Sequence, residues 1–277
     1  MNKVANRLLT FFIGVPLMLI LVTQDYASHL IMNIVIVAAS IISTHELVKM
    51  LSKKVKLFPE WIYISASLIL TISAYILVYF GVYVELIQWI FVLIILTLFS
   101  IEAFTQKEFS KSVEKLGFSL LVVFNGAYLF TFVSRFALIE NSQYYLGLFF
   151  ILVFMCDSAA WFFGILLGKS TRGYVKASPN KSLVGFIGGV LSSVASGIIL
   201  MFIFPKIFNF SIWWMILLGF ATGLAGIAGD LIESVLKRAC DVKDSGNIIP
   251  GRGGMLDCTD SILIAAPIFY IIVYFIY

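Results

Sequence analysis

Long apolar runs separated by short polar stretches dominate this chain. A helix that crosses a membrane needs about 20 mostly apolar residues, and nine segments meet or approach this length. The nine segments are residues 8–23, 29–44, 61–80, 83–101, 117–138, 145–168, 184–204, 212–236 and 258–277. Apolar positions within each run are continuous rather than alternating with polar ones, which argues against the strands of a membrane barrel. The pattern predicts an all-α, polytopic integral membrane protein with about nine transmembrane helices.

The first two runs leave alternatives open. They are short and close together, so a helical hairpin or a re-entrant pair is an alternative to two full spans. Lys3 and Arg7 precede the first run as in a signal peptide, but the many later spans favour a first helix that is retained. Composition supports the membrane class, because 61% of the residues are hydrophobic and 12% are charged, against about half and about a quarter in soluble domains.

Basic residues divide unequally between the two sides of the predicted membrane. With a cytoplasmic N-terminus, 17 of the 19 Lys and Arg residues face the cytoplasm, and Arg135 and Lys206 lie outside. Cytoplasmic loops carry the excess of Lys and Arg in membrane proteins. We therefore expect the N-terminus inside and Tyr277 outside.

The cytoplasmic loops are of two kinds. Loops 45–60 and 102–116 carry charge without glycine, and we interpret them as solvated surfaces that face anionic headgroups. Glu85 and Glu102 are interpreted as interfacial. Loops 169–183 and 237–257 instead combine cations with Gly, Pro, Ser and acids, which is less typical of a plain surface.

Acidic residues inside or at the rim of apolar helices are functional candidates, because burying a charge in a membrane is costly. Asp157 lies in the sixth run, Asp230 and Glu233 lie near the end of the eighth, and Asp257 and Asp260 open the ninth. The spacing of three and four places Asp230, Glu233 and Lys237 on one helix face. Capping of a helix N-terminus is the alternative for Asp257 and Asp260.

The acids and their neighbours suggest a metal site beside phosphate. Without a His or Cys partner, Asp230, Asp257 and Asp260 favour a hard cation such as Mg²⁺, which typically takes one or two carboxylates plus substrate phosphates. Nearby cations suit phosphate oxygens, and glycines allow a backbone to approach a ligand. These residues are Lys237, Arg238, Lys243, Arg252, Gly251, Gly253 and Gly254. The combination indicates phosphoryl or nucleotidyl chemistry on a lipid headgroup, with a cation transporter as the alternative.

Two further features have competing interpretations. Gly223, Gly226 and Gly229 recur every three residues, and we interpret them as close helix packing. In loop 169–183, Lys181 and its neighbouring cations either bind phosphate or only mark the cytoplasmic side. Ser182 is placed to cap the next helix after Pro179 interrupts the chain.

Three motifs resemble the phosphatidate cytidylyltransferases, also called CDP-diacylglycerol synthases. Residues 229–261, GDLIESVLKRACDVKDSGNIIPGRGGMLDCTDS, are similar to that family's S-x-x-K-R-x(4)-K-D followed by P-G-H-G-G-x-x-D-R-x-D. Upstream, DSAAWFFGILLGK (157–169) and SPNKSLVGFIGG (178–189) resemble its two other motifs, in the same order. The first half of the chain matches only in being hydrophobic. Three positions depart from the family pattern, since Arg252 replaces His, Cys258 replaces Arg and Val184 replaces Glu.

The resemblance implies that CTP and phosphatidate give CDP-diacylglycerol and pyrophosphate, in phospholipid biosynthesis. A related CTP-dependent enzyme on another lipid, such as a polyprenol kinase or an archaeol-type synthase, and an inactive homologue or transporter stay as alternatives. The residues implied in catalysis and phosphate binding are Lys237, Arg238, Lys243, Asp244 and Arg252. Those implied in substrate binding are Ser178, Lys181, Ser234, Gly251, Gly253, Gly254 and Asp157, and those implied in Mg²⁺ binding are Asp230, Asp257 and Asp260.

The same resemblance sets the expected organisation and partners. We expect N-terminal transmembrane helices in 1–116 and a catalytic transmembrane region in 117–277, within a single membrane unit. The expected partners are CTP, phosphatidate and membrane lipid, without nucleic acid, and a homodimer and a second cation such as K⁺ are left open. The expected location is a bacterial inner (plasma) membrane, with the active site on the cytoplasmic side.

Overall fold

The structure, a computed structural model, describes residues 14 and 16–276. Within these residues the secondary structure is helical, and two isolated β-bridges are the only extended pairings. The described part contains eight helical segments long and apolar enough to cross a membrane. This confirms the predicted all-α, polytopic membrane class.

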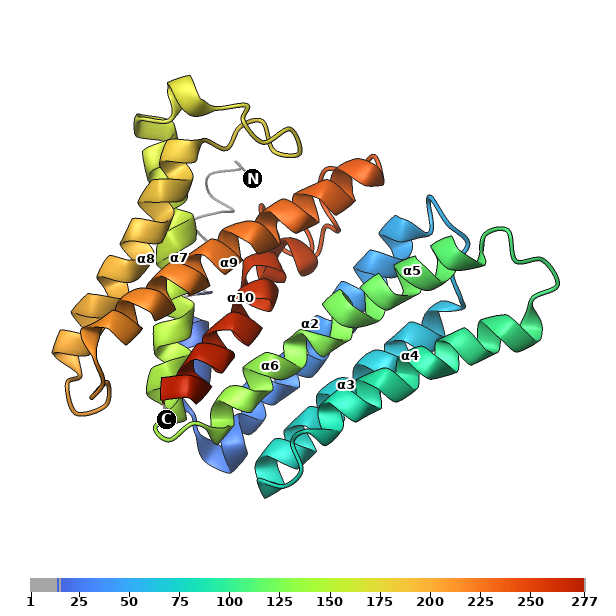
Figure 1. Ribbon diagram of the computed structural model, residues 1–277, viewed down its shortest axis with the longest axis horizontal. Helices are drawn as coiled ribbons and strands as arrows, with labels where there is room; N and C mark the ends of the chain where they lie inside the picture. Colours follow the sequence, from blue (N-terminus) through green and yellow to red (C-terminus); the bar gives the residue numbers. More distant parts are fainter. Residues whose placement is uncertain (1–13, 15, 277) are drawn as a thin grey trace. The chain divides into compact units, whose positions relative to one another are not determined.

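The helices follow the predicted spans closely (Figure 1). Seven spans are single helices, namely α2 (Tyr26–Leu51), α3 (Glu60–Phe80), α4 (Leu86–Thr105), α7 (Ser142–Leu166), α8 (Leu183–Ile203), α9 (Ile212–Ala239) and α10 (Leu256–Ile276). The remaining span, Ser112–Leu138, is built from α5 (Ser112–Val123), the π-turn η1 (Phe124–Tyr128), α6 (Phe130–Arg135) and the 3₁₀ turn η2 (Phe136–Leu138). Another 3₁₀ turn, η3 (Lys169–Thr171), follows α7. Residues 14 and 16–23 of the predicted span 8–23 are helical, and the rest of that span lies outside the described residues, so the full span stays a prediction.

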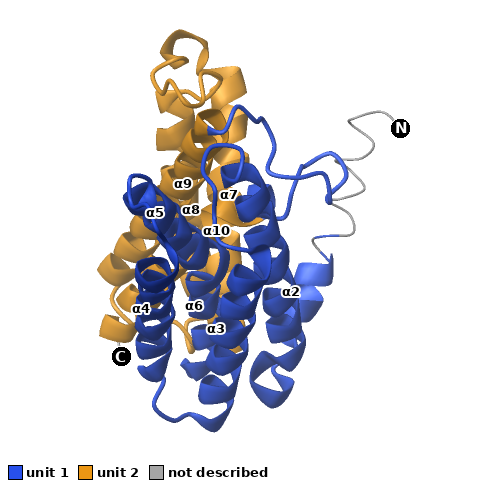
Figure 2. Ribbon diagram, turned by 90° about the vertical axis from the view of Figure 1, so that its right-hand side faces the viewer, with its two compact units in different colours: residues 1–140, 240–258 blue, residues 141–239, 259–277 orange. Residues whose placement is uncertain are grey.

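The chain forms two compact units (Figure 2). Unit 1 contains the described residues up to Glu140 together with Cys240–Cys258, and unit 2 contains Asn141–Ala239 together with the chain from Thr259 onward. The Gly-rich segment after α9 therefore belongs with the N-terminal helices, although it is distant from them in sequence. The predicted division at residue 116 concerns function and stays a prediction.

In unit 1, short polar side chains hold α2 against its neighbours. The Ser40 hydroxyl donates to the Gly126 carbonyl at 2.6 Å and contacts the Ser67 hydroxyl at 2.7 Å. Thr44 donates to the same Gly126 carbonyl at 3.1 Å. Hydrogen bonds of this kind are common between membrane helices, whose surroundings offer no water as a partner. They fix the C-terminal half of α2, the part that carries Glu46.

In unit 2, glycines let helices approach closely, as the spacing of Gly223, Gly226 and Gly229 predicts. A Cβ atom on Gly229 would lie 2.3 Å from the Asp260 carbonyl oxygen, and one on Gly223 would lie 3.1 Å from the Ser193 Cβ. The packing interpretation is therefore confirmed for both glycines. The contact at Gly229 matters for the site, because it sets α9 and α10 side by side where Asp230 and Asp260 lie.

Ser182 caps the N-terminus of α8, as predicted, by accepting the Gly185 backbone N–H at 3.1 Å. We expect Ser182→Ala to lower the free energy of unfolding by about 1 kcal/mol, because the helix loses this acceptor. Denaturant unfolding in detergent micelles measures the change. Ser196→Ala, in the middle of the same helix, is the control and should have a smaller effect. Equal stability of the two variants would contradict the capping role.

Candidate active site

Three of the predicted acidic residues come together in unit 2. Asp157 on α7 lies close enough to Asp230 on α9 and Asp260 on α10 to interact electrostatically with both, and its side chain hydrogen-bonds with Ser261. Lys181 also lies close enough to Asp157 to interact electrostatically with it. The three carboxylates come from three different helices, so the fold rather than local sequence brings them together.

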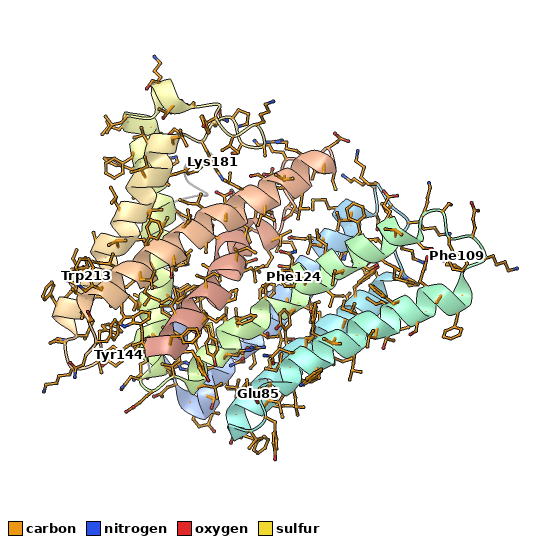
Figure 3. All side chains as sticks on the ribbon, in the orientation of Figure 1. Glu85, Phe109, Phe124, Tyr144, Lys181 and Trp213 are labelled. Atoms are coloured by element: carbon orange, nitrogen blue, oxygen red, sulfur yellow. The ribbon has the colours of Figure 1, made fainter. Side chains whose placement is uncertain are left out.

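The loop between α7 and α8 delivers Lys181 to this cluster. Arg172 pairs with Ser182 in an antiparallel bridge, and the Gly173 N–H donates to the Pro179 carbonyl at 2.9 Å. The loop therefore closes on itself, and Lys181, which precedes α8, forms an ion pair with Asp230. Lys181 is labelled in Figure 3. This ion pair gives Lys181 a place in the acidic cluster as well as a positive charge on the predicted cytoplasmic side.

The C-terminal end of α9 presents its charges on one face, as the spacing predicts. Lys237 forms an ion pair with Glu233 at 3.0 Å, and the Glu233 side chain also hydrogen-bonds with Asp260. Arg238 donates to the Ala177 carbonyl at 3.3 Å, next to Ser178. Glu233 is 3% exposed, so it supports the cluster from inside the packed helices. Ser234, the predicted contact on the same helix, is partly buried.

In unit 1, the Gly-rich loop that ends at α10 folds around Asp257. One carboxylate oxygen, Oδ2, accepts the Ser245 N–H at 2.8 Å, the Ser245 hydroxyl at 3.0 Å and the Gly254 N–H at 2.7 Å. Gly253 has φ of +108°, a conformation that side chains rarely adopt, and a Cβ there would lie 2.4 Å from the same oxygen. Asp257 thus shapes the loop, and its predicted role as a metal ligand stays a prediction.

The remaining predicted residues of the loop face outward. Lys243, Asp244, Gly251 and Arg252 are exposed. The same segment carries Asp241, whose carboxylate forms an ion pair with Lys54 at 2.6 Å. That pairing lowers the pKa of Asp241, since the hydrogen bond and the charge of Lys54 both stabilise the carboxylate. Exposed cations on an ordered Gly-rich loop suit contact with phosphate, which stays a prediction.

Glu46 is the residue that sequence reasoning missed. The span predicted at 29–44 placed it in a solvated loop, but α2 continues to Leu51 and Glu46 is 2% exposed. Its carboxylate accepts hydrogen bonds from Ser245, Met255 and Leu256 in the Gly-rich loop. A buried acid that accepts three hydrogen bonds from a distant loop is a structural element of that loop.

Glu102 differs from the solvated surface predicted for loop 102–116, because its side chain is buried, whereas Glu85 is exposed. The interfacial interpretation of both residues stays a prediction. Glu102 is 3% exposed, forms an ion pair with Lys115 at 2.6 Å and accepts a hydrogen bond from Ser112 at 2.7 Å. The polar residues around it resemble a surface loop in sequence, yet they pair with each other between α4 and α5. Pairing is what makes burial of such charges tolerable.

The donor set of unit 2 fits a hard divalent cation. Asp157, Asp230 and Asp260 supply carboxyl oxygen atoms, the ligand type that such a cation prefers. Among residues 14 and 16–276, however, no group of three or more His, Cys, Asp or Glu side chains is already arranged around a metal position. Mg²⁺ is typically held by one or two carboxylates together with water and substrate phosphates, and the metal site stays a prediction.

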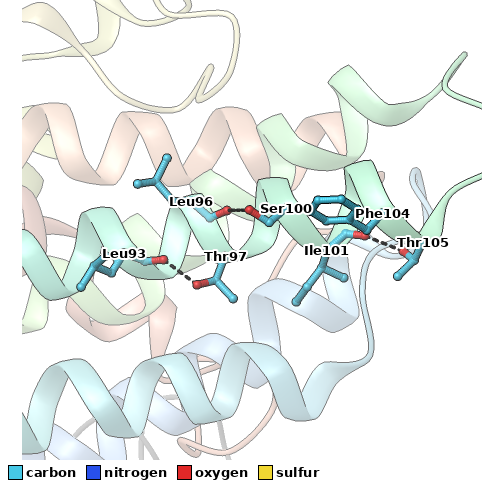
Figure 4. Close-up of a pocket in the computed structure, with 7 residues that line it drawn as sticks. All are labelled: Leu93, Leu96, Thr97, Ser100, Ile101, Phe104 and Thr105. Carbon is cyan, nitrogen blue, oxygen red and sulfur yellow. Dashed lines mark hydrogen bonds between the residues drawn. The ribbon is translucent and has the colours of Figure 1, made fainter.

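A hollow on α4 does not fit this chemistry (Figure 4). It has a volume of about 410 Å³ and is lined by side chains of α4. Thr97, Ser100 and Thr105 donate their hydroxyl hydrogens to carbonyls one turn earlier in the same helix. The hollow therefore offers an apolar surface suited to lipid chains, and it lacks charged groups for a nucleotide.

Comparison with known proteins matches the chain to one family over nearly its whole length. The profile of the cytidylyltransferase family matches residues 5–276. This range includes the N-terminal helices, which carry none of the three motifs.

Curated relatives share about two fifths of their residues with the matched part of the chain. Phosphatidate cytidylyltransferase of Staphylococcus haemolyticus is 38% identical over 141 residues, which cover 51% of this chain and 53% of the relative. The proteins of the same name from Staphylococcus saprophyticus and Staphylococcus aureus are 38% and 36% identical over 133 residues, covering 48% of this chain and 50% of each relative. The chain thus spans about half the length of the curated relatives in these matches.

Proposed function

The chain belongs to the cytidylyltransferase family, and from this premise we propose that it transfers CMP from CTP to phosphatidate, giving CDP-diacylglycerol and pyrophosphate. The observation that carries the proposal is the meeting of Asp157, Asp230 and Asp260 beside Lys181 in unit 2. These residues lie within the segments that resemble the family motifs. The names of the staphylococcal relatives support the choice of phosphatidate as the lipid.

The proposed reaction suits a site without a general base. A phosphate oxygen of phosphatidate attacks the α-phosphorus of CTP, the bond between the α-phosphorus and the bridging oxygen breaks, and pyrophosphate leaves with the electron pair. The attacking oxygen is already ionised near neutral pH, so no proton has to be removed. The barrier lies in bringing two anions together and in stabilising the leaving group, which cations address.

We propose that Asp230, Asp257 and Asp260 hold Mg²⁺, with Asp157 supporting the metal or orienting a cation. When bound, Mg²⁺ would neutralise charge on the phosphates of CTP and on the leaving pyrophosphate. The meeting of Asp157, Asp230 and Asp260 in unit 2 supports the roles proposed for these three residues. A second cation such as K⁺ beside Mg²⁺ is compatible with the same donor set.

The protein's own cations and small side chains would hold the substrates. We propose phosphate contacts for the cationic and Gly-rich residues of the two loops and of α9, and a supporting role for Asp244. The cations are Lys181, Lys237, Arg238, Lys243 and Arg252. The glycines are Gly251, Gly253 and Gly254, and the small hydroxyl side chains Ser178 and Ser234 complete the proposed set. Exposure of Lys243 and Arg252 supports this for the Gly-rich loop.

The chain is a multi-pass membrane protein. We propose that it lies in a bacterial inner (plasma) membrane with its N-terminus and active site on the cytoplasmic side. The excess of Lys and Arg in the loops on that side supports the orientation. A homodimer is compatible with this placement, and we propose no nucleic-acid partner.

Two radiolabelled forms of CTP test the function and separate the alternatives. Purified protein is incubated in detergent with phosphatidate, Mg²⁺ and CTP labelled at either the α- or the γ-phosphorus. The proposal expects α-label in the lipid and γ-label in pyrophosphate. A CTP-dependent lipid kinase would instead place γ-label in its lipid acceptor, and archaeal-type lipids in place of phosphatidate test the other synthase. Folded protein that labels no lipid would overturn both enzyme functions and leave the transporter or inactive homologue.

Arg252 stands where the resembled family has His, and we expect Arg252→His to retain activity. Arg252 is exposed on the loop, and guanidinium groups keep their charge near neutral pH. We expect kcat to change by less than about threefold, and KM for CTP to rise a few-fold above pH 7, where His is largely neutral. Steady-state assays at pH 6 and pH 8 measure both. A large fall in kcat at both pH values would show that the chemistry here requires Arg.

A further inference from the structure

The Gly-rich loop of unit 1 is built around a buried carboxylate that lies far away in the sequence. Glu46 on α2 accepts the Met255 N–H at 3.0 Å through Oε1, and the Leu256 N–H at 2.9 Å through Oε2. Oε2 also accepts the Ser245 hydroxyl at 3.0 Å. One side chain thus holds the beginning and the end of the loop.

The chemistry of the helix N-terminus explains why a carboxylate occupies this position. The first backbone N–H groups of a helix have no partner within the helix and carry partial positive charge. Glu46 supplies acceptors for two N–H groups at the start of α10, from a neighbouring helix rather than from the adjacent chain. Two oxygen atoms on one rigid group also fix the direction in which α10 begins.

The glycines next to Glu46 show that the loop is fitted to it. A Cβ on Gly254 would lie 2.5 Å from both Glu46 carboxylate oxygens, and one on Gly246 would lie 2.3 Å from Oε1. Side chains at either position would therefore push the loop off the carboxylate. The close approach of Glu46 therefore favours glycine at position 254, in addition to the predicted contact of Gly254 with phosphate.

Ser245 joins Glu46 to the second carboxylate of the loop. Its hydroxyl lies 3.0 Å from Glu46 Oε2 and 3.0 Å from Asp257 Oδ2, while its N–H donates to Asp257 at 2.8 Å. The ion pair of Lys54 and Asp241 lies near the start of the same segment but is exposed, so it contributes little to holding the loop. The exposed residues Lys243 and Arg252 are therefore presented from a loop whose shape depends on two internal acids.

We infer that Glu46 is a positioning residue: through Ser245, Met255 and Leu256 it sets the Gly-rich loop in the conformation that presents Lys243 and Arg252 to the phosphates of CTP. That the ligand is CTP rests on the proposed function. That Glu46 fixes the conformation of the loop rests on the hydrogen bonds of Glu46. Glu46 acts through the loop and is not assigned a contact with substrate.

Glu46→Gln is the variant that tests this inference. The amide keeps the shape of the side chain but replaces one acceptor oxygen with an NH₂ donor. One of the two backbone N–H groups at the start of α10 then faces another donor. We expect kcat per folded molecule to fall by roughly 30-fold, with a smaller change in KM for CTP, because the loss of a buried acceptor displaces the loop.

Glu102→Gln is the matched control. Glu102 is similarly buried in unit 1 but pairs with Lys115 and Ser112, away from the loop. This variant should lower the melting temperature while leaving kcat per folded molecule and KM unchanged. If Glu46→Gln affected only global stability, its kinetics would resemble those of Glu102→Gln, and the positioning role would be overturned.

Limited trypsin cleavage of the full chain in detergent measures how often the loop opens, and this measurement does not depend on enzyme activity. Lys243 and Arg252 are exposed cleavage sites within it, and Lys176 in unit 2 serves as an internal reference. We expect Glu46→Gln to speed cleavage after Lys243 and Arg252 by about tenfold relative to Lys176, because opening of the loop governs access. Unchanged cleavage would overturn the hold of Glu46 on the loop. If the wild-type protein labels no lipid, the proposed function fails, whereas the cleavage rates still decide the inference about Glu46.

Discussion

Asp260→Asn is expected to reduce CDP-lipid formation by roughly 1,000-fold or more without weakening the fold. Asparagine keeps the size of the side chain and one acceptor oxygen but removes the charge that we propose for Mg²⁺. Asp260 lies close to Asp230 and hydrogen-bonds with Glu233. The amide of asparagine can donate to Glu233 and is uncharged beside Asp230, so the melting temperature in the absence of metal should stay equal or rise.

The combination of lost activity and retained stability separates a site residue from a structural one. Lipid labelling from α-labelled CTP and thermal unfolding in detergent are measured on the same preparation. Asp241→Asn is the control, because Asp241 is exposed and paired with Lys54, and it should behave as wild type in both assays. A fall in melting temperature that accounts for the loss of activity of Asp260→Asn would contradict the metal role.

Binding of Mg²⁺ should also depend on CTP. Mg²⁺ is typically held by one or two carboxylates together with substrate phosphates, so we propose that CTP supplies part of the coordination. We therefore expect weak binding of Mn²⁺, as a paramagnetic substitute, until CTP is added. Asp260→Asn should remove the increase that CTP causes.

Hydropathy predicted most of the helical spans. A membrane requires continuous apolar helices, however those helices pack against each other. The end of α2 was missed for a physical reason. Thr44, His45 and Glu46 look like the start of a polar loop, but Thr44 and Glu46 have buried hydrogen-bond partners inside the protein. Polarity in the sequence marks a need for partners and does not reveal whether water or protein supplies them.

Sequence could predict the arrangement of charges on α9 but could not predict the contact between Glu46 and the Gly-rich loop. Helical periodicity placed Asp230, Glu233 and Lys237 on one face, and the ion pair of Glu233 with Lys237 bears this out. The contact of Glu46 with Ser245 spans 199 positions, and no local pattern encodes it. The resemblance to family motifs also drew attention to the C-terminal half, where Glu46 does not lie.

Lys181→Met is expected to lower kcat/KM for CTP by roughly 100-fold, because it removes a cation from a site that must bind several phosphates. Lys181 pairs with Asp230 and lies near Asp157, so it belongs to the charge balance of the cluster. Steady-state kinetics at saturating Mg²⁺ measure the effect. Lys176→Met, which removes an exposed cation from the same loop, is the matched control and should stay within about twofold of wild type, since exposed charges contribute little.

The dependence on Mg²⁺ then shows which of two roles Lys181 has. If Lys181 only offsets the charge of Asp230, Lys181→Met would leave more negative charge for the metal, and the half-saturating Mg²⁺ concentration would fall while kcat was retained. If Lys181 contacts phosphate, kcat/KM for CTP falls at every Mg²⁺ concentration and added metal does not restore it. We expect the second result, because the loop that carries Lys181 closes on itself and delivers the cation from outside the helices that carry the acids. Activity of Lys181→Met within threefold of wild type at saturating Mg²⁺ would refute the phosphate contact.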